Sequence, residues 1–400
     1  MTVPWLTILG IGEDGALSAT AQAYLRDAAL VVGGARHLGL AAPHILGDRL
    51  PWSSPMDAAI AVILARRPTA VAVLASGDPY WFGAGTTLAR HVTAAETRCI
   101  PAPAAFTLAC AALGWALQDC ETLSFCGRPM SALLPVLQPG ARILALSGDA
   151  DTPAAVAALM EARGFGPSRL HVLEALGGPH QRIRTSAAAG FALDGVHPLN
   201  MLGIEVAAAP GAQLIPLAPG LPEAMFEHDG QITKREIRAA TLSALAPRRG
   251  ERLWDIGCGS GSVGIEWCLC HPANRAVGVD GDPDRAARAG RNAASLGVAL
   301  EVVAGPAPGA MAGLPRPDAV FIGGGAADPG VIAAAWDALP PDGRLVANAV
   351  TIETEAALLD ARGRLGGSLT RLSVERLDRI GSMHGYRPAM TVTQWLAVKG

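Results

Sequence analysis

Short apolar runs alternate with Ala-rich segments of helical period along almost the whole chain. Apolar runs of about four to eight residues predict buried strands, and longer Ala-rich stretches predict helices. The upstream part is predicted to hold strands near 5–9, 70–75, 122–125, 141–146, 169–174 and 199–206, and helices near 18–28, 105–113, 131–137 and 153–163. This alternation is typical of α/β folds.

The downstream part repeats the pattern from Glu251 to the end of the chain. One helix is well marked, because Asp282 can cap it, Pro283 suits its first turn and Gly297 can end it. Strands are predicted near 252–256, 276–280, 300–304, 318–322, 344–349, 370–376 and 392–398.

Between the two parts, residues 207–224 have neither period and carry four prolines and two glycines. Proline removes backbone donors and favours extended conformations, so this composition indicates a linker. A chain of four hundred residues is also longer than one ordinary hydrophobic core can organise. We therefore predict two α/β domains, 1–206 and 225–400, joined by the linker 207–224.

Composition excludes several classes of protein. Half of the residues are apolar, 17% are charged and the net charge is −3, with Lys and Arg dispersed. This balance argues against disorder and against a nucleic-acid partner. The apolar runs are shorter than the ~20 residues of a membrane span. The N-terminus leads directly into a strand without a charged leader, so we expect a cytoplasmic protein with no membrane partner.

The seven cysteines do not form a C-x-x-C pair or a metal-like spacing with histidine. We expect plain, mostly buried thiols and no metal site. They are Cys99, Cys110, Cys120, Cys126, Cys258, Cys268 and Cys270.

The segment LWDIGCGSGSVGIEW, residues 253–267, fits two kinds of ligand site. Gly259, Gly261 and Gly264 spell the dinucleotide-binding pattern G-x-G-x-x-G, with an acid, Asp280, about 20 residues further on. Asp255 and the glycines that follow also spell D-x-G-x-G-x-G, a pattern of methyltransferases that use S-adenosylmethionine. The glycines alone do not distinguish a dinucleotide from S-adenosylmethionine. Asp255 can pair with the ammonium group of S-adenosylmethionine, but this favours the methyl donor only weakly.

Residues outside the loop decide between these ligands by resemblance. HDGQITKREIRAATLSAL (228–245), the glycine loop, 305–325 and 347–358 resemble, in this order, the decarboxylating precorrin and cobalt-precorrin methyltransferases of corrin biosynthesis. The resemblance implies a class I Rossmann-like methyltransferase fold over 225–400. It also implies donor contacts from Thr233, Gly257, Cys258, Gly259, Ser260 and Gly261, with Asp280 on the ribose and Ala307 beside the adenine. Pro306 stands where the family usually has an acidic residue.

The first half resembles another family. LGIGEDG (9–15), ASGDPYWFG (75–83), LSFCGRPMSALLPVL (123–137), LEALGGPHQRI (173–183) and LNMLGIEV (199–206) are similar to the tetrapyrrole methylases of the class III fold. The resemblance implies two α/β lobes with the donor between them. The implied lining residues are Gly10, Gly12, Gly77, Asp78 and Pro79. Cys126 stands where relatives usually have histidine, and 101–106 lacks the usual glycine and hydroxyls.

Both resemblances on one chain imply an enzyme of the aerobic vitamin B12 route. It would use two S-adenosylmethionine sites to methylate a tetrapyrrole, precorrin-6B, at C5 in the first domain and at C15 in the second, and would remove the C12 acetate carboxyl. Cations must bind the substrate's carboxylates, because guanidinium and ammonium groups form charge-assisted hydrogen bonds with them. The candidates are Lys234, Arg235, Arg379, His384 and Arg387.

The sequence leaves two alternatives and no assigned acid or base. One domain could be a catalytically idle carrier or assembly module, and a nicotinamide oxidoreductase shares the loop pattern. The nucleophile is a carbon of the substrate, and the protein has only to hold it close to the sulfonium. Methyl transfer therefore needs no covalent nucleophile from the protein. We also expect a homo-oligomer.

Overall fold

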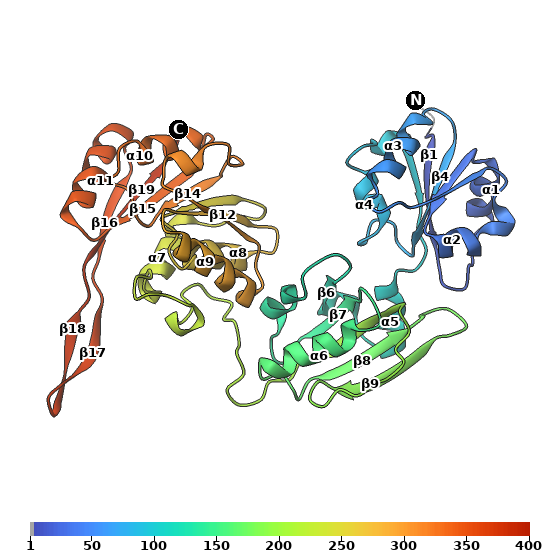
Figure 1. Cartoon of the computed structure of the whole chain (residues 1–400), viewed down its shortest axis with the longest axis horizontal. Helices are drawn as coiled ribbons and strands as arrows, with labels where there is room; N and C mark the ends of the chain where they lie inside the picture. Colours follow the sequence, from blue (N-terminus) through green and yellow to red (C-terminus); the bar gives the residue numbers. More distant parts are fainter. Residues whose placement is uncertain (1–3) are drawn as a thin grey trace. The chain divides into compact units, whose positions relative to one another are not determined.

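The computed structural model describes residues 4–400 and divides into two compact units (Figure 1). The first unit runs to Met130 and continues over Val136–Gln213. The second comprises Ser131–Pro135 and Leu214–Gly400. Each unit has its own sheets and its own buried core.

The first lobe of the first unit is a five-stranded parallel sheet in the order β3-β2-β4-β1-β5. Its central strands are buried apolar runs, as two-sided coverage by helices requires. Its strands are β1 (Leu6–Ile11), β2 (Leu30–Gly33), β3 (Asp48–Pro51), β4 (Val71–Ser76) and β5 (Thr97–Ile100). Its helices are α1 (Ala19–Asp27), α2 (Ala35–Leu40), α3 (Asp57–Ala65) and α4 (Ala84–Leu88).

The second lobe is a five-stranded mixed sheet in the order β6-β7-β10-β8-β9. Trp81 and Phe82, which follow β4 in the chain, pack against Phe106 in this lobe's core. The strands are β6 (Cys120–Ser124), β7 (Arg142–Leu146), β8 (Arg169–Glu174), β9 (Arg182–Ala187) and β10 (Asn200–Glu205). The helices are α5 (Ala105–Leu113) and α6 (Thr152–Ala162).

The proline-rich segment 207–224 is tied to structure at both ends. The Ala209 and Gln213 backbones donate to Gly164 and Arg163 of the first unit. The backbone amides of Gly220 and Leu221 donate to the buried Glu266 carboxylate of the second unit, at 2.6 and 2.9 Å. The stretch between these two sets of contacts is therefore shorter than the composition of 207–224 indicates.

The second unit is built on a seven-stranded sheet in the order β13-β12-β11-β14-β15-β19-β16. Strands β11 to β15 are parallel, and β19 runs antiparallel between β15 and β16. The strands are β11 (Arg252–Ile256), β12 (Arg275–Asp280), β13 (Leu300–Ala304), β14 (Ala319–Ile322), β15 (Arg344–Ala349), β16 (Ser368–Leu372) and β19 (Val392–Val398).

The helices of the second unit follow its parallel strands. Helix α9 (Pro283–Leu296) begins and ends as predicted, because Asp282 accepts the amides of Asp284 and Arg285 and Gly297 adopts a left-handed φ of 73°. The other helices are α7 (Arg235–Leu245), α8 (Ser262–Cys270), α10 (Val331–Ala338) and α11 (Ile352–Leu365). Within residues 4–400, the model has no helix with the length and apolarity needed to cross a membrane.

Two local predictions are wrong. The helix expected near 131–137 is a 3-10 helix, Met130–Val136, with Pro135 inside it, where proline cannot support α-helical bonding. The strand expected near 370–376 is interrupted, and the residues between it and the last strand form an antiparallel hairpin of β17 (Glu375–Ile380) and β18 (Met383–Pro388). The hairpin extends away from the second unit's sheet (Figure 1). It has no buried face, so its sequence lacks the apolar alternation of a half-buried strand.

Candidate active site

A cavity of about 860 Å³ lies at the carboxyl end of the parallel strands in the second unit. The chain runs from β11 to β12 and β13 on one side of the sheet, and then to β14 and β15 on the other. Ligands bind α/β sheets at such a switch point, where the loops after two adjacent strands separate. The loops after β11 and β14 both line the cavity.

Glycines shape the loop after β11. Gly257, Gly259 and Gly261 have φ values of 66°, 56° and 75°, in the left-handed region that side chains disfavour. A Cβ on Gly257 would lie 2.7 Å from the amide nitrogen of Gly324, so the loops after β11 and β14 touch there. A Cβ on Gly259 would have only the Gln231 carbonyl oxygen within 4 Å, at 3.7 Å. The loop thus keeps its backbone close to the cavity.

Two carboxylates face this loop. Asp280, at the end of β12, accepts the Gly259 amide at 2.7 Å and the Asp282 amide at 2.9 Å, one on each oxygen. Each oxygen keeps a second lone pair for a ligand hydroxyl. Asp255 accepts the Gly264 amide at 2.8 Å through Oδ2. Its buried Oδ1 has no hydrogen-bond partner within residues 4–400.

The environment of Asp255 is unusual for a carboxylate. Its pKa is raised to about 7, mainly by burial; the hydrogen bond from Gly264 opposes this rise, and the Asp280 charge adds to it. A buried carboxylate with an unpaired oxygen has a high affinity for a cationic group, because that group would restore the charge partner that burial removes. The side chain lines the cavity.

The expected donor contacts of the second unit lie together. Thr233, Gly257, Cys258, Gly259, Ser260, Asp280 and Ala307 all line the cavity. Gly261 does not line it; it is the N-cap residue of α8. Pro306 lies beside Ala307 and contributes only apolar side-chain atoms to that wall. The buried Ser260 hydroxyl has no hydrogen-bond partner within the described residues.

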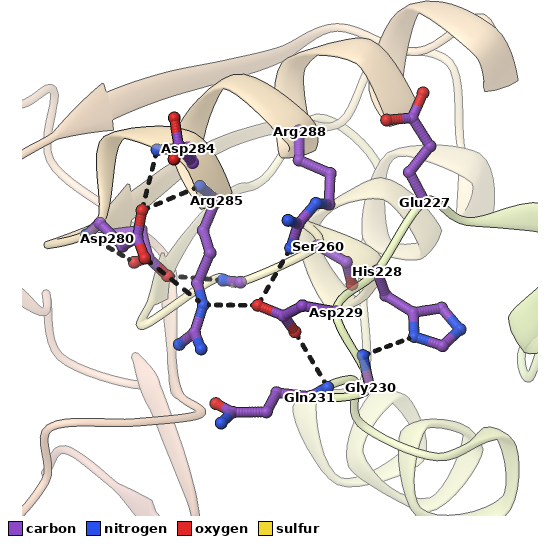
Figure 2. Close-up of polar contacts among 12 residues, drawn as sticks. Glu227, His228, Asp229, Gly230, Gln231, Ser260, Asp280, Asp284, Arg285 and Arg288 are labelled. Carbon is purple, nitrogen blue, oxygen red and sulfur yellow. Dashed lines mark hydrogen bonds and ion pairs between the residues drawn. The ribbon is translucent and has the colours of Figure 1, made fainter.

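The segment Gly230–Lys234 forms the wall opposite the glycine loop. Figure 2 shows the start of this segment next to α9, where Asp229 contacts Arg285 and Arg288. Arg285 also lines the cavity. Sequence reasoning missed these α9 contacts, because only the fold brings 229 and 285 together.

The expected substrate cations are divided between two places. Lys234 lines the cavity, whereas Arg235, the first residue of α7, does not. Arg379, His384 and Arg387 lie on the β17–β18 hairpin, outside the cavity lining. Arg376, at the base of the hairpin, lines the cavity and pairs with Glu236.

Other residues that sequence reasoning missed come from the loop after β14 and from β15 itself. Gly323–Gly325 follow β14 and line the cavity, together with Asn348. Three consecutive glycines after a predicted strand are the same signal that marked the loop after β11. Asn348 has no such signal: it is placed by hydrogen bonds with Thr241 and Gln394, at 2.9 and 3.0 Å.

In the first unit, the expected donor residues meet at the carboxyl edge of the first lobe's sheet. Gly10 lies within β1, Gly12 follows it, and Gly77 follows β4 with a φ of 55°. The Gly77 amide donates to Ile11 at 3.1 Å, and its carbonyl accepts the Ala102 amide at 3.1 Å. Asp78 caps the next turn by accepting the Tyr80 amide at 2.8 Å, and the Pro79 carbonyl accepts the Gly85 amide.

A polar cluster not predicted from the sequence lies beside this edge. Arg36 pairs with Glu13, and its guanidinium is 2.9 Å from His37 Nε2. That nitrogen is also 3.0 Å from the Ser76 hydroxyl, one residue before Gly77. Burial, and then the Arg36 charge, lower the pKa of His37 to about 4, so the imidazole is neutral near pH 7.

The cysteine positions offer no metal site. All seven cysteines are free thiols, and within residues 4–400 no cluster of three metal-binding side chains is present. Cys126, the residue at the usual histidine position, donates to the Ser147 carbonyl at 3.2 Å.

Comparison with known proteins assigns the two units separately. Residues 8–191 match the model of the tetrapyrrole (corrin/porphyrin) methylases, and residues 224–399 match the model of the precorrin methyltransferase domain. A precorrin-6Y C(5,15)-methyltransferase (decarboxylating) from Sinorhizobium sp. is 56% identical over 400 residues, covering 99% of this chain and 97% of that protein. The chain belongs to this family. Both resemblances inferred from the sequence are confirmed, and so are the two different folds that they imply.

The chain is also similar to other proteins of this precorrin-6Y methyltransferase family. A protein of the same name from Mycobacterium tuberculosis (strain ATCC 25618 / H37Rv) is 40% identical over 400 residues, covering 98% of this chain and 100% of that protein. The crystal structure of the C-terminal domain of precorrin-6Y C5,15-methyltransferase from Rhodobacter capsulatus is 44% identical. It matches 46% of this chain and 100% of that domain, with a TM-score of 0.44.

Proposed function

We propose that this protein is a cytoplasmic S-adenosylmethionine-dependent methyltransferase of cobalamin biosynthesis with one donor site in each unit. It methylates precorrin-6B at C5 and C15 and removes the carboxyl of the C12 acetate, giving precorrin-8X. The first domain, 1–206, carries out the C5 methylation, and the second, 225–400, carries out the C15 methylation and the decarboxylation. The names of the full-length relatives support the overall reaction.

One observation carries the second-unit assignment: Asp255, whose buried Oδ1 has no hydrogen-bond partner within residues 4–400, lines the cavity beside the glycine loop. The ammonium group of the donor's amino-acid part fits this carboxylate, and both ribose hydroxyls fit the free lone pairs of Asp280. The loop bears no cation for a pyrophosphate, and its acids repel one, so it suits S-adenosylmethionine better than a dinucleotide. Thr233, Cys258, Ser260 and Ala307 complete the donor wall.

When bound, S-adenosylmethionine supplies an electrophilic methyl group on a sulfonium. The residues of the chain orient that group, because Asp255 holds the amino-acid part of the donor and Asp280 holds its ribose, on the two sides of the sulfonium. The wall formed by Gly230–Lys234 excludes water from one side. A site with little water favours the reaction, since positive charge disperses as the methyl group leaves sulfur. No covalent nucleophile is needed from the protein.

The other end of the cavity suits the macrocycle. Val350, Val374 and Met390 line it with apolar atoms, and Lys234 and Arg376 supply cations for peripheral carboxylates. A carboxylate facing the apolar side chains loses hydration that would otherwise stabilise its charge, which favours release of carbon dioxide. The electron pair of the broken carbon–carbon bond delocalises into the conjugated ring, and a proton from solvent then completes the methyl group. Arg235, Arg379, His384 and Arg387 remain candidates for carboxylates that extend beyond the cavity.

In the first unit, we assign the donor to the edge formed by Gly10, Gly12 and the Gly77–Pro79 turn. Ligands of parallel α/β sheets bind at the carboxyl ends of the strands, and β1 and β4 end there side by side.

We also propose that the protein is a homo-oligomer. The β17–β18 hairpin carries four exposed apolar side chains, and an isolated two-stranded ribbon is only marginally stable. A second copy would cover these side chains: Leu377, Ile380, Met383 and Tyr386. Light scattering tests this proposal, because Tyr386→Glu should reduce the measured mass if the hairpin forms the interface.

The function is tested by incubating the purified full chain with precorrin-6B and S-adenosylmethionine. Mass spectrometry should find a product with two added methyl groups and one carbon dioxide lost. A product with one methyl group would support the alternative of a catalytically idle domain. No methylated product under any condition would contradict the proposed function.

A further inference from the structure

The segment 229–233, which we call the strap, runs beside the second-unit cavity, and its residues 230–233 line that cavity. The carbonyl oxygen of Gln231 lies 3.7 Å from the position of a Cβ on Gly259, so the strap meets the glycine loop there. The strap and the loop together bound the cavity, and a donor held in it can pass between them only if the strap moves.

Buried contacts hold both ends of the strap. Just before it, the Asn292 amide group accepts the Glu227 amide at 2.8 Å and donates to the Glu227 carbonyl at 3.0 Å and to the Ser260 carbonyl at 2.8 Å. At its other end, Arg238 donates to the Thr233 carbonyl and pairs with Glu266 at 2.5 Å. Asn292 is 1% exposed and Arg238 is fully buried, so water does not compete for these contacts.

Near its beginning, the strap is held by more accessible ion pairs. Asp229 Oδ2 is 3.0 Å from Arg285 Nε and 3.1 Å from Arg288 NH1, as Figure 2 shows. These three side chains are 31%, 30% and 20% exposed. Ion pairs that water can reach are weak and are screened by salt, in contrast to the buried contacts at the ends.

We propose that Asp229 is a positioning residue, whose ion pairs with Arg285 and Arg288 hold the strap over the donor, and that the strap opens here for donor exchange. This inference rests on the proposed function, because it assumes a donor in the second unit. Asp229 does not line the cavity, so it acts through the strap. Arg285 lines the cavity, so it connects Asp229 with the ribose side of the proposed donor site. Arg285 Nε also lies 3.9 Å from an oxygen of the Asp282 carboxylate.

The charge of Asp229 is constant across neutral pH. The backbone hydrogen bond from Gln231 and the bond from Arg288 lower its pKa to about 2. Salt is therefore the variable that loosens the contact. The product S-adenosylhomocysteine is a suitable probe, because it is a zwitterion without net charge and responds little to salt by itself.

Asp229→Asn is the test variant, since asparagine can still accept the Gln231 amide but lacks the charge. Arg288→Gln removes the partner from the other side, and Arg288 does not line the cavity. Glu227→Gln is the matched control. The ion pair of Glu227 with Arg291 also joins α9 to the chain, two positions before Asp229. Both side chains are more than half exposed and lie outside the cavity lining.

Hydrogen–deuterium exchange of the full chain separates the two donor sites. Protection of the 257–261 peptide at increasing S-adenosylhomocysteine concentrations gives the affinity of the second unit alone, and the 9–15 peptide is an internal reference. Asp229→Asn and Arg288→Gln should each weaken this affinity roughly threefold to tenfold. Both should speed exchange in the 228–234 peptide, and the double variant should lose little more than either single variant.

Raising the salt concentration should weaken wild-type binding toward that of Asp229→Asn and leave the variant almost unchanged, a result that a general loss of stability would not give. Glu227→Gln should behave as wild type. If ligand protects 257–261 equally in wild type and Asp229→Asn at every salt concentration, the inference is wrong and the proposed function stands. If ligand never protects 257–261 in wild type, the donor site itself is wrong.

Discussion

The glycine-rich segments of the two units follow the same strand-to-loop pattern but have different physical roles. In the first unit, a Cβ on Gly10 would lie 2.0 Å from the Gly77 carbonyl oxygen and 2.4 Å from the Ala102 amide nitrogen. In the second unit, a Cβ on Gly259 would meet only the Gln231 carbonyl oxygen, at 3.7 Å. Gly10 allows three backbone segments to pack, whereas Gly259 allows a left-handed turn beside a cavity.

The difference shows that glycines in similar sequence patterns can meet different physical requirements. At Gly10, the requirement is space, and its φ is not in the left-handed region. At Gly259, the requirement is backbone conformation, and a side chain there would contact the ligand space. Substitutions should therefore damage packing in the first unit and donor binding in the second.

The largest effect is expected from Gly10→Ala. The added methyl group would overlap two backbone atoms that no rotamer change can move, so we expect a loss of at least about 3 kcal/mol in the stability of the first unit. Gly39→Ala is the control, because it lies in α2 with nothing within 4 Å of its Cβ and should be neutral or slightly stabilising. Thermal unfolding measures both; similar melting of the two variants would disprove the close packing.

Asp280→Ala should affect the second donor site alone. Charged hydrogen bonds to ribose contribute roughly 1.5–3 kcal/mol each, so donor binding there should weaken tenfold or more. At limiting donor, the product should carry the C5 methyl group, keep the C12 acetate and lack the C15 methyl group. Unchanged affinity at this site, measured by calorimetry, would contradict the ribose assignment. Equal loss at both sites, with a lowered melting temperature, would indicate unfolding.

Gly259→Ala should have a smaller effect than Gly10→Ala on stability. A left-handed conformation costs a residue with a side chain about 1–2 kcal/mol, and the new methyl group meets no clash. Donor affinity in the second unit should fall by less than tenfold, and the first unit should be unaffected. A melting temperature as low as that of Gly10→Ala would remove the distinction between the two glycines.

The smallest expected effects come from the titration of Asp255, which should release a proton when the donor binds. The pKa of Asp255 is raised from 3.8 to about 7 in the folded chain, so the folded state binds more protons than the unfolded state between these values. The contribution of this group to stability is thus greatest below pH 3.8, falls as the pH rises through this window and is constant above about pH 7. Asp255→Asn should remove this dependence from the free energy of unfolding.

An ammonium group beside Asp255 would lower its pKa again and displace the proton. Calorimetry of S-adenosylhomocysteine binding near pH 6, in two buffers with different ionisation heats, should detect release of a fraction of a proton in wild type and less in Asp255→Asn. The same proton count in both proteins would exclude Asp255 as the ammonium partner.

Sequence patterns predicted α9 and most of the buried strands, because these have strong local signals, but they missed the short buried strand β2. Buried strands such as β4 and β14 are apolar runs, and α9 has its cap, its proline and its final glycine within its own sequence. The hairpin β17–β18 was missed because cross-strand pairing, rather than burial, forms it. The break between β16 and β17 was missed for the same reason.

The cavity was only partly predictable. Glycine loops after strands and the acids beside them are local features, so Gly257, Gly259 and Asp280 could be identified. The ion pairs of Asp229 join residues 56 or more positions apart, such as Asp229 with Arg285, and depend on how α9 packs. Arg376 on β17 and Asn348 on β15 reach the cavity for similar reasons, because only the folded unit brings these strands to it.

The central claim is that each unit holds its own donor site, and titration of the full chain with S-adenosylhomocysteine tests it most directly. Calorimetry should give two sites per chain for wild type and one high-affinity site for Asp280→Ala. A single site in wild type, or a variant that loses both sites while its melting temperature is unchanged, would contradict the account.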